Sequence, residues 1–149
     1  MSLFIALLLP AAPQSLGIYD AWGAFADRGP RRCYAMSAPV QKGRTAFVAV
    51  GVWPASSARP QLHVRFSRPR SDSARVTLTI GERRFRLTAG PRDGWAPDAE
   101  TDRAIVAAMR GARSLSVESV GTDRRPFADV YRLSGAATAI DAARVACAT

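Results

Sequence analysis

Residues 75–88 read RVTLTIGERRFRLT, and this stretch decides the fold class. Val76, Leu78 and Ile80 alternate with polar residues, and the same alternation resumes after a Gly-Glu turn with Phe85. A period of two places one side of a strand on a core and the other side in solvent. The stretch therefore predicts an antiparallel hairpin with one buried face.

Similar patterns extend outward from this hairpin in both directions. Residues 45–53 are apolar on both faces, which is typical of a central strand covered on both sides. A Gly- and Pro-containing segment over residues 90–97 is expected to be a loop. Further strands are expected at residues 17–25, 33–37, 62–66, 115–120 and 127–133.

Two short helices complete the predicted fold. One covers residues 99–110, with Asp98 as its N-cap and Gly111 at its end. The other follows Ser134, which is expected to cap it, and places Ala136, Ile140, Ala143 and Cys147 on one face. With about eight strands, the sequence predicts a mainly β, β-sandwich-like fold of antiparallel sheets with two short helices.

Length and composition are those of one globular domain. The chain has 149 residues, of which 48% are hydrophobic and 22% are charged. A chain of this length buries enough apolar surface to fold without a metal or many disulfides. No linker or repeat divides it between Leu16 and Thr149.

The N-terminus has the pattern of a signal peptide. Leu3 to Leu9 is an unbroken apolar run that ends at Pro10 and is followed by Ala11 and Ala12. The run has the length of a signal-peptide core and is too short to span a bilayer. We expect residues 1–15 to be the signal, with cleavage between about residues 11 and 16, and residues 16–149 to form the domain. The alternative is a buried N-terminal strand or helix.

Export would make the protein periplasmic or secreted and would bear on its two cysteines. In an oxidising compartment Cys33 and Cys147 have one possible pairing within the chain, a disulfide that joins the last helix to an early strand. An intermolecular bridge, or two free thiols in a cytosolic protein, are the alternatives. No other segment is long and apolar enough for a transmembrane anchor.

The charge is strongly positive and is carried by arginine. The net charge is +9, and Lys42 is the only lysine among 21 basic residues. If the alternating strands are neighbours, Arg65, Arg75, Arg84 and Arg86 line one face. Such a face attracts polyanions, so an anionic envelope or glycan component or an acidic protein is the expected partner. The alternative is a solvated face that keeps the protein soluble.

Residues with catalytic or metal-binding chemistry are few. His63 is the only histidine, and a surface histidine is the simpler interpretation. Asp98 is better explained as a helix cap than as a ligand of a cation, and Glu100 and Asp102 suit the first turn of the helix. We therefore expect no catalytic residues, no metal site and no cofactor. Nucleic acid is not expected as a partner, because no aromatic residues interleave the arginines.

Three further blocks of sequence are informative: the segment from Trp22 through Cys33 to Pro39, the segment Asp102 to Gly111, and the segment Asp129 to Gly135. Together and in this order they resemble the invasion-associated locus B family. The resemblance implies a small exported envelope protein of α-proteobacteria, associated in some members with entry into host cells, and it implies no catalytic residues. The expected function is a non-catalytic envelope protein that binds an anionic or protein partner. A small periplasmic hydrolase with an unrecognised site is the alternative.

Overall fold

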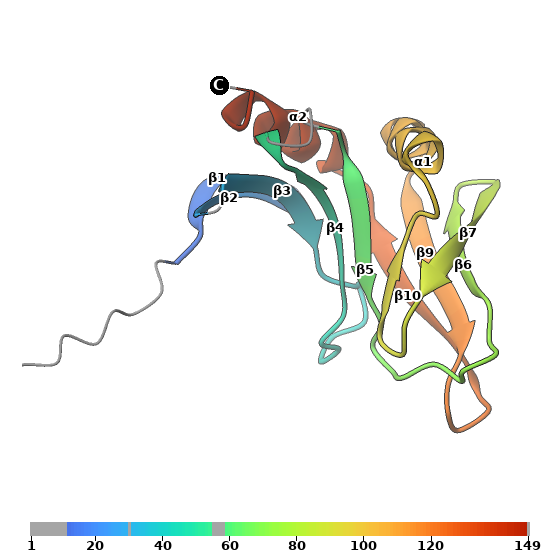
Figure 1. Cartoon of the computed structure of the whole chain (residues 1–149). Helices are drawn as coiled ribbons and strands as arrows, with labels where there is room; N and C mark the ends of the chain where they lie inside the picture. Colours follow the sequence, from blue (N-terminus) through green and yellow to red (C-terminus); the bar gives the residue numbers. More distant parts are fainter. Residues whose placement is uncertain (1–11, 30, 55–58, 149) are drawn as a thin grey trace, which may run out of the picture.

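The structure is a computed structural model that describes residues 12–29, 31–54 and 59–148, so most of the predicted signal peptide lies outside it. The described chain is mainly β, as predicted, with ten strands and two helices (Figure 1). The strands are β1 (Gln14–Tyr19), β2 (Trp22–Arg28), β3 (Arg31–Ser37), β4 (Phe47–Val52), β5 (Gln61–Arg65), β6 (Val76–Ile80), β7 (Arg83–Ala89), β8 (Asp93–Trp95), β9 (Ser114–Val120) and β10 (Pro126–Arg132). The helices are α1 (Ala99–Gly111) and α2 (Ala136–Ala146).

All ten strands belong to one antiparallel sheet in the order β1-β2-β3-β4-β5-β8-β7-β6-β9-β10. The three-residue strand β8 joins two halves, because it pairs with β5 on one side and with β7 on the other. The halves pack against each other: the Phe66 and Phe127 rings lie 6.2 Å apart, and Trp22 Nε1 donates to the Arg132 carbonyl at 2.8 Å. The sandwich-like packing therefore comes from one sheet bent on itself.

The β6–β7 hairpin has the predicted alternation. Val76, Leu78 and Ile80 are at most 2% exposed and Leu87 is 6% exposed, so this face lies in the core. The opposite face carries threonines and exposed arginines. The prediction from the period of two is confirmed here.

Both helices lie at the same end of the sheet (Figure 1). Asp98 caps α1 as predicted, since the Thr101 N–H donates to its carboxylate at 2.7 Å, and this bond holds the pKa of Asp98 below its usual value. The predicted cap of α2 is wrong. Gly135 occupies the N-cap position with φ of +89°, and Ser134 Oγ instead donates to Asp20 at 2.8 Å.

The predicted disulfide is present. Cys33 of β3 and Cys147 at the end of α2 are bonded, with their Cα atoms 5.9 Å apart. Both residues are at most 1% exposed and lie in a small cluster with Val52 and Ala143. The bridge therefore fastens α2 to the N-terminal half of the sheet.

Two strands were missed by the sequence prediction. Residues 17–25 form parts of β1 and β2 rather than one strand, because the chain turns at Asp20, whose φ is +50°. Aspartate tolerates this left-handed conformation better than most residues. The predicted loop at residues 90–97 contains β8, which is too short to show an alternating pattern.

Candidate binding groove

Strand β4 and Trp53, which follows it, present two different apolar faces. Val48, Val50 and Val52 are at most 1% exposed and lie in the core. The other face carries Phe47, Ala49, Gly51 and Trp53 in sequence, and all of these except Gly51 are partly exposed. The prediction that this strand is covered on both sides is therefore wrong. Its second face lines a groove on the outside of the sheet.

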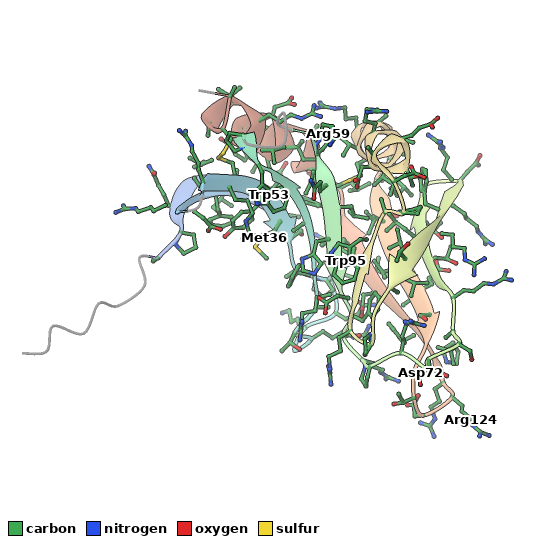
Figure 2. The ribbon with its side chains drawn as sticks, viewed as in Figure 1. Met36, Trp53, Arg59, Asp72, Trp95 and Arg124 are labelled. Atoms are coloured by element: carbon green, nitrogen blue, oxygen red, sulfur yellow. A yellow bond between two sulfur atoms is a disulfide. The ribbon has the colours of Figure 1, made fainter. Side chains whose placement is uncertain are left out.

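The groove has a floor of small residues and walls of large ones. Across the sheet, Ala49 lies between Met36 of β3 and His63 of β5, and Gly51 lies between Tyr34 and Gln61. The residues Arg32, Tyr34, Met36, Phe47, Ala49, Gly51, Trp53, Gln61 and His63 enclose about 290 Å³, and we call this site the β4 groove. Figure 2 labels Met36 and Trp53 on this part of the sheet.

Gly51 makes room for Trp53. A Cβ atom at this position would lie 3.0 Å from the Trp53 indole, tighter than an ordinary contact. The indole therefore rests on the bare backbone of β4. The two small residues Ala49 and Gly51 let larger side chains rise on both sides of the floor.

One wall is a layer of aromatic rings and a guanidinium. The Arg32 guanidinium lies 4.5 Å from the centre of the Tyr34 ring and 5.8 Å from that of Trp53, within the range of cation–π contact. Asp27 holds the same guanidinium at 2.9 Å. Burial and then Asp27 raise the pKa of Tyr34, so its hydroxyl is a neutral donor. Phe25 stacks behind Tyr34 at 5.6 Å.

The opposite wall is built around His63. Its ring stacks on Trp95 of β8 at 5.6 Å with an angle of 6° between the planes, and it meets Phe47 edge-on at 5.0 Å. His63 Nε2 lies 2.8 Å from the Asp93 carboxylate, which Arg65 approaches at 3.3 Å. The sequence pattern did not reveal Asp93 as a partner, because β8 was not recognised as a strand. Trp95 is 44% exposed, so part of its ring faces solvent.

A second hollow adjoins the groove. It encloses about 490 Å³ over β1 to β3 and shares Met36 and Phe47 with the β4 groove. Its lining is mainly apolar and includes Ile18, which is 69% exposed, and Phe25. The two hollows therefore adjoin at Met36 and Phe47.

The four arginines predicted to share a face do not form one cluster. Strand β8 separates Arg65 from β7 and supplies Asp93, which pairs with Arg65. Arg84 and Arg86 are exposed on β7, opposite Thr79 and Thr77. Arg75 and Arg86 border a shallow hollow of about 200 Å³. The structure thus groups Arg75, Arg84 and Arg86, and polyanion binding by these residues stays a prediction.

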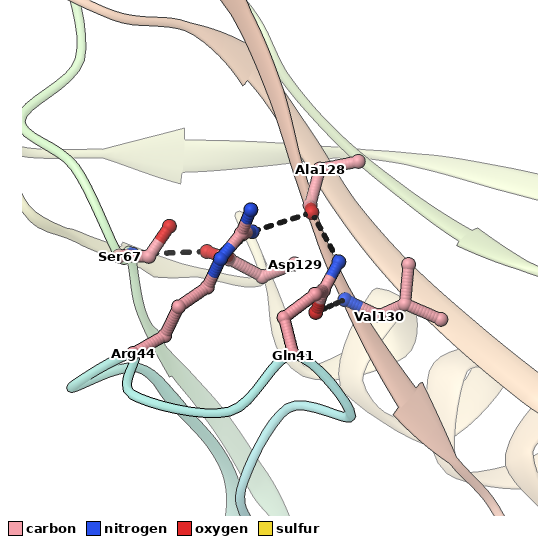
Figure 3. A network of polar contacts seen from close by, with 6 residues as sticks. All are labelled: Gln41, Arg44, Ser67, Ala128, Asp129 and Val130. Atoms are coloured by element: carbon pink, nitrogen blue, oxygen red, sulfur yellow. Dashed lines mark hydrogen bonds and ion pairs between the residues drawn. The ribbon is translucent and has the colours of Figure 1, made fainter.

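A buried ion pair fixes the edge of β10. Asp129 has a fully buried side chain that accepts from Arg44 at 2.8 Å and from the Ser67 N–H at 2.9 Å. Figure 3 shows Arg44 and Gln41 reaching from the loop before β4 to β10, where Gln41 bonds the backbone of Ala128 and Val130. This network covers a sheet edge that would otherwise be open, so its role is structural.

Other acidic residues also have structural partners. The Asp102 carboxylate accepts from the Leu62 N–H at 2.8 Å, and burial raises the pKa of Asp102. In residues 12–29, 31–54 and 59–148, no group of three or more His, Cys, Asp or Glu is placed to hold a metal ion. In the same ranges, no helix is long and apolar enough to cross a membrane.

The fold is similar to that of a solved structure, invasion associated protein B from Bartonella henselae. The TM-score is 0.68 at 16% sequence identity, and the similarity covers 91% of this chain and 97% of that chain. No protein-family model and no curated protein matches the sequence. At this level of identity the similarity establishes a shared fold, and the neighbour is a protein of the kind that the sequence resemblance named.

Proposed function

We propose that the protein is an exported, non-catalytic binding protein of the cell envelope, and that the β4 groove holds its ligand. The outward face of β4 carries this proposal, since it sets two small residues between walls of partly exposed aromatic rings. Ligand sites are typically concave and largely apolar, with a few polar groups that orient the ligand. Arg32, Gln61 and His63 are such groups here.

Export is supported by the apolar run in residues 3–9 and by the disulfide, because such bridges persist in oxidising compartments. Strand β1 begins at Gln14, which pairs with Ala26 of β2. Cleavage before Gln14 would leave this strand whole. Mass spectrometry of the periplasmic fraction should therefore find a mature N-terminus between about residues 11 and 14. A cytosolic protein that retains its first residues would contradict export.

Envelope binding is tested by sedimentation of the purified mature protein with isolated cell envelopes. Trp53→Ala removes one wall of the β4 groove and should lower the bound fraction by about ten-fold, as loss of a central aromatic anchor does. Val145→Ser changes an apolar residue of α2 that is 73% exposed, and it should bind as the unaltered protein does. Equal binding by the unaltered protein and both variants would show that the β4 groove is not the binding site.

A hydrolase remains the second candidate, and the contact of His63 with Asp93 is the observation that favours it. A carboxylate 2.8 Å from an imidazole can orient that imidazole as a general base. The residues that line the β4 groove include no serine, threonine or cysteine to act as a nucleophile, so the simplest such enzyme would use His63 to activate water. A turnover that His63→Gln abolishes, with ligand binding intact, would establish the hydrolase.

A role in host-cell entry is a further proposal about the function of this protein. The name of the Bartonella henselae protein associates that protein with invasion. The shared fold supports a related non-enzymatic role for this chain, and the exposed concave face supplies a surface through which it would act.

A further inference from the structure

The β4 groove combines an aromatic surface with polar side chains, and few ligands complement both. Its walls offer aromatic surface, from Tyr34 and Trp53 on one side and from His63 on the other. Its polar groups include Gln61, which carries both a donor and an acceptor, and Arg32, which carries only donors. A ligand that fits must have an apolar face for the rings and hydrogen-bonding groups along its edge.

We propose that the β4 groove binds acidic glycan, with the carboxylate of a uronic-acid ring on Arg32; this identifies the ligand of the function proposed above and rests on it. A pyranose ring is apolar across its C–H faces and polar around its edge, which is the combination that the groove requires. Partly exposed aromatic rings with polar groups at hand suit such amphipathic surfaces.

Arg32 is prepared for a carboxylate. Its guanidinium lies within cation–π reach of both the Tyr34 and the Trp53 ring and pairs with Asp27. Arginine has five N–H donors in a rigid fork, so its contacts with Asp27 and with the Tyr34 hydroxyl leave donors for a second carboxylate. Arg32 Nε is buried and has no hydrogen-bond partner in the described part of the chain.

The adjoining hollow indicates that the ligand is longer than one ring. The β4 groove encloses about 290 Å³ and the neighbouring hollow about 490 Å³, and Met36 and Phe47 line both. The second hollow is the more apolar of the two and has Phe25 as a ring face. A short linear oligosaccharide would therefore place its acidic unit at Arg32 and a further unit near Phe25.

Trigalacturonate and its methyl ester are the matched probes, because they share the same sugar rings and differ at the carboxyl groups, which are charged in the acid and neutral in the ester. Of the three tryptophans, Trp53 lines the groove and Trp95 stacks on His63, which also lines it, so intrinsic fluorescence together with calorimetry reports occupancy. The acid should bind about ten-fold more tightly than the ester, as expected for one charge-assisted contact. Arg32→Gln should lower binding of the acid to that of the ester.

Two further variants guard against a general effect of charge or folding. Arg124→Gln removes the same charge at the far end of the β9–β10 loop, where Figure 2 labels Arg124, and it should retain the preference for the acid. Trp53→Ala should lose binding of both probes, and Trp53→Phe, which keeps a ring face, should restore part of it. Unchanged binding by Arg32→Gln, or equal affinity for acid and ester, would overturn the proposal.

The outcomes also separate this inference from the function on which it rests. If a proline-rich peptide binds in a manner that requires Trp53 and neither trigalacturonate nor its ester binds, the glycan is wrong and the binding function stands. The same holds if sedimentation with envelopes depends on Trp53 while no sugar binds. If neither the sugars nor envelopes bind in a groove-dependent way, both proposals fail.

Discussion

At Gly135 the start of α2 passes directly against β1. A Cβ atom there would lie 1.8 Å from the Tyr19 carbonyl oxygen, and φ is +89°. Gly135→Ala should therefore lower the free energy of unfolding by at least about 1–3 kcal/mol, the cost of a strained backbone before any clash. Urea denaturation measures this change.

Gly111 is the matched control for that substitution. It ends α1, and a Cβ atom there would meet no heavy atom of the described chain within 4 Å. Gly111→Ala should raise stability by about 0.5–1 kcal/mol, since alanine loses less backbone freedom in a helix. If both variants unfold at the same urea concentration, the close approach of α2 to β1 is not as the structure places it.

Single residues also mark where sequence patterns stop being informative. Asp98 was predicted as a cap because a local spacing identifies it, and the structure confirms it. Ser134 fits the same local pattern, but the approach of Tyr19 to Gly135 comes from a strand far away in the sequence. The partner of His63 is likewise 30 residues away, at Asp93. Contacts between residues far apart in the sequence depend on the three-dimensional path of the chain, and the spacing of neighbouring residues does not reveal that path.

At the scale of elements, strands with polar outer faces were predicted well and β4 was not. Along β7, exposed arginines alternate with buried apolar residues, and this alternation predicted which face of the strand points to solvent. The segment from Phe47 to Trp53 is apolar on both sides, and such a strand is usually buried on both sides. In this chain the second apolar face lines the groove. The sequence therefore did contain a sign of the candidate site, namely the second apolar face of β4. In the described part of the chain, no other segment covers that face.

The arginines of the outer sheet face should act on the rate of binding. Changing Arg65, Arg75, Arg84 and Arg86 together to glutamine removes four charges outside the β4 groove. Long-range charge speeds association and makes it sensitive to salt, whereas close contacts govern dissociation. The variant should associate with trigalacturonate more slowly at low salt and dissociate at an unchanged rate, as measured by stopped-flow fluorescence.

The same variant tests the assigned orientation of these strands. The Arg65 side chain is 43% exposed in its ion pair with Asp93, and such surface pairs contribute about 0–1 kcal/mol. The melting temperature should therefore change little. Unfolding of the variant would show that these side chains are structural. A faster dissociation rate would move the contact site from the groove to the arginines.

At the scale of the whole molecule, strand β3 separates stability from binding. Its residues alternate, with Arg32, Tyr34 and Met36 toward the groove and Cys33 toward the core cluster that contains Cys147. The fold class and the disulfide were predictable from alternation and from the cysteine count. The bending of one sheet into two packed halves was not, because it depends on the three-residue strand β8.

This separation gives the last prediction. The disulfide joins residues 114 positions apart, so in the chain-entropy model it restricts the unfolded chain by about 4–5 kcal/mol. That amount is a large part of the roughly 5–15 kcal/mol by which a domain is stable. Changing Cys33 and Cys147 together to alanine, which avoids burying hydroxyl groups, should lower the melting temperature strongly. Chemical reduction of the unaltered protein should produce a similar loss of stability, because the source of that stability is the bridge and not the cysteine side chains.

Under conditions where the alanine variant is still folded, its affinity for trigalacturonate should be unchanged, since the bridge lies on the other face of β3 from Arg32 and Tyr34. Weaker binding by the folded variant would mean that α2 and the bridge hold the groove in shape, and that stability and binding are coupled through β3.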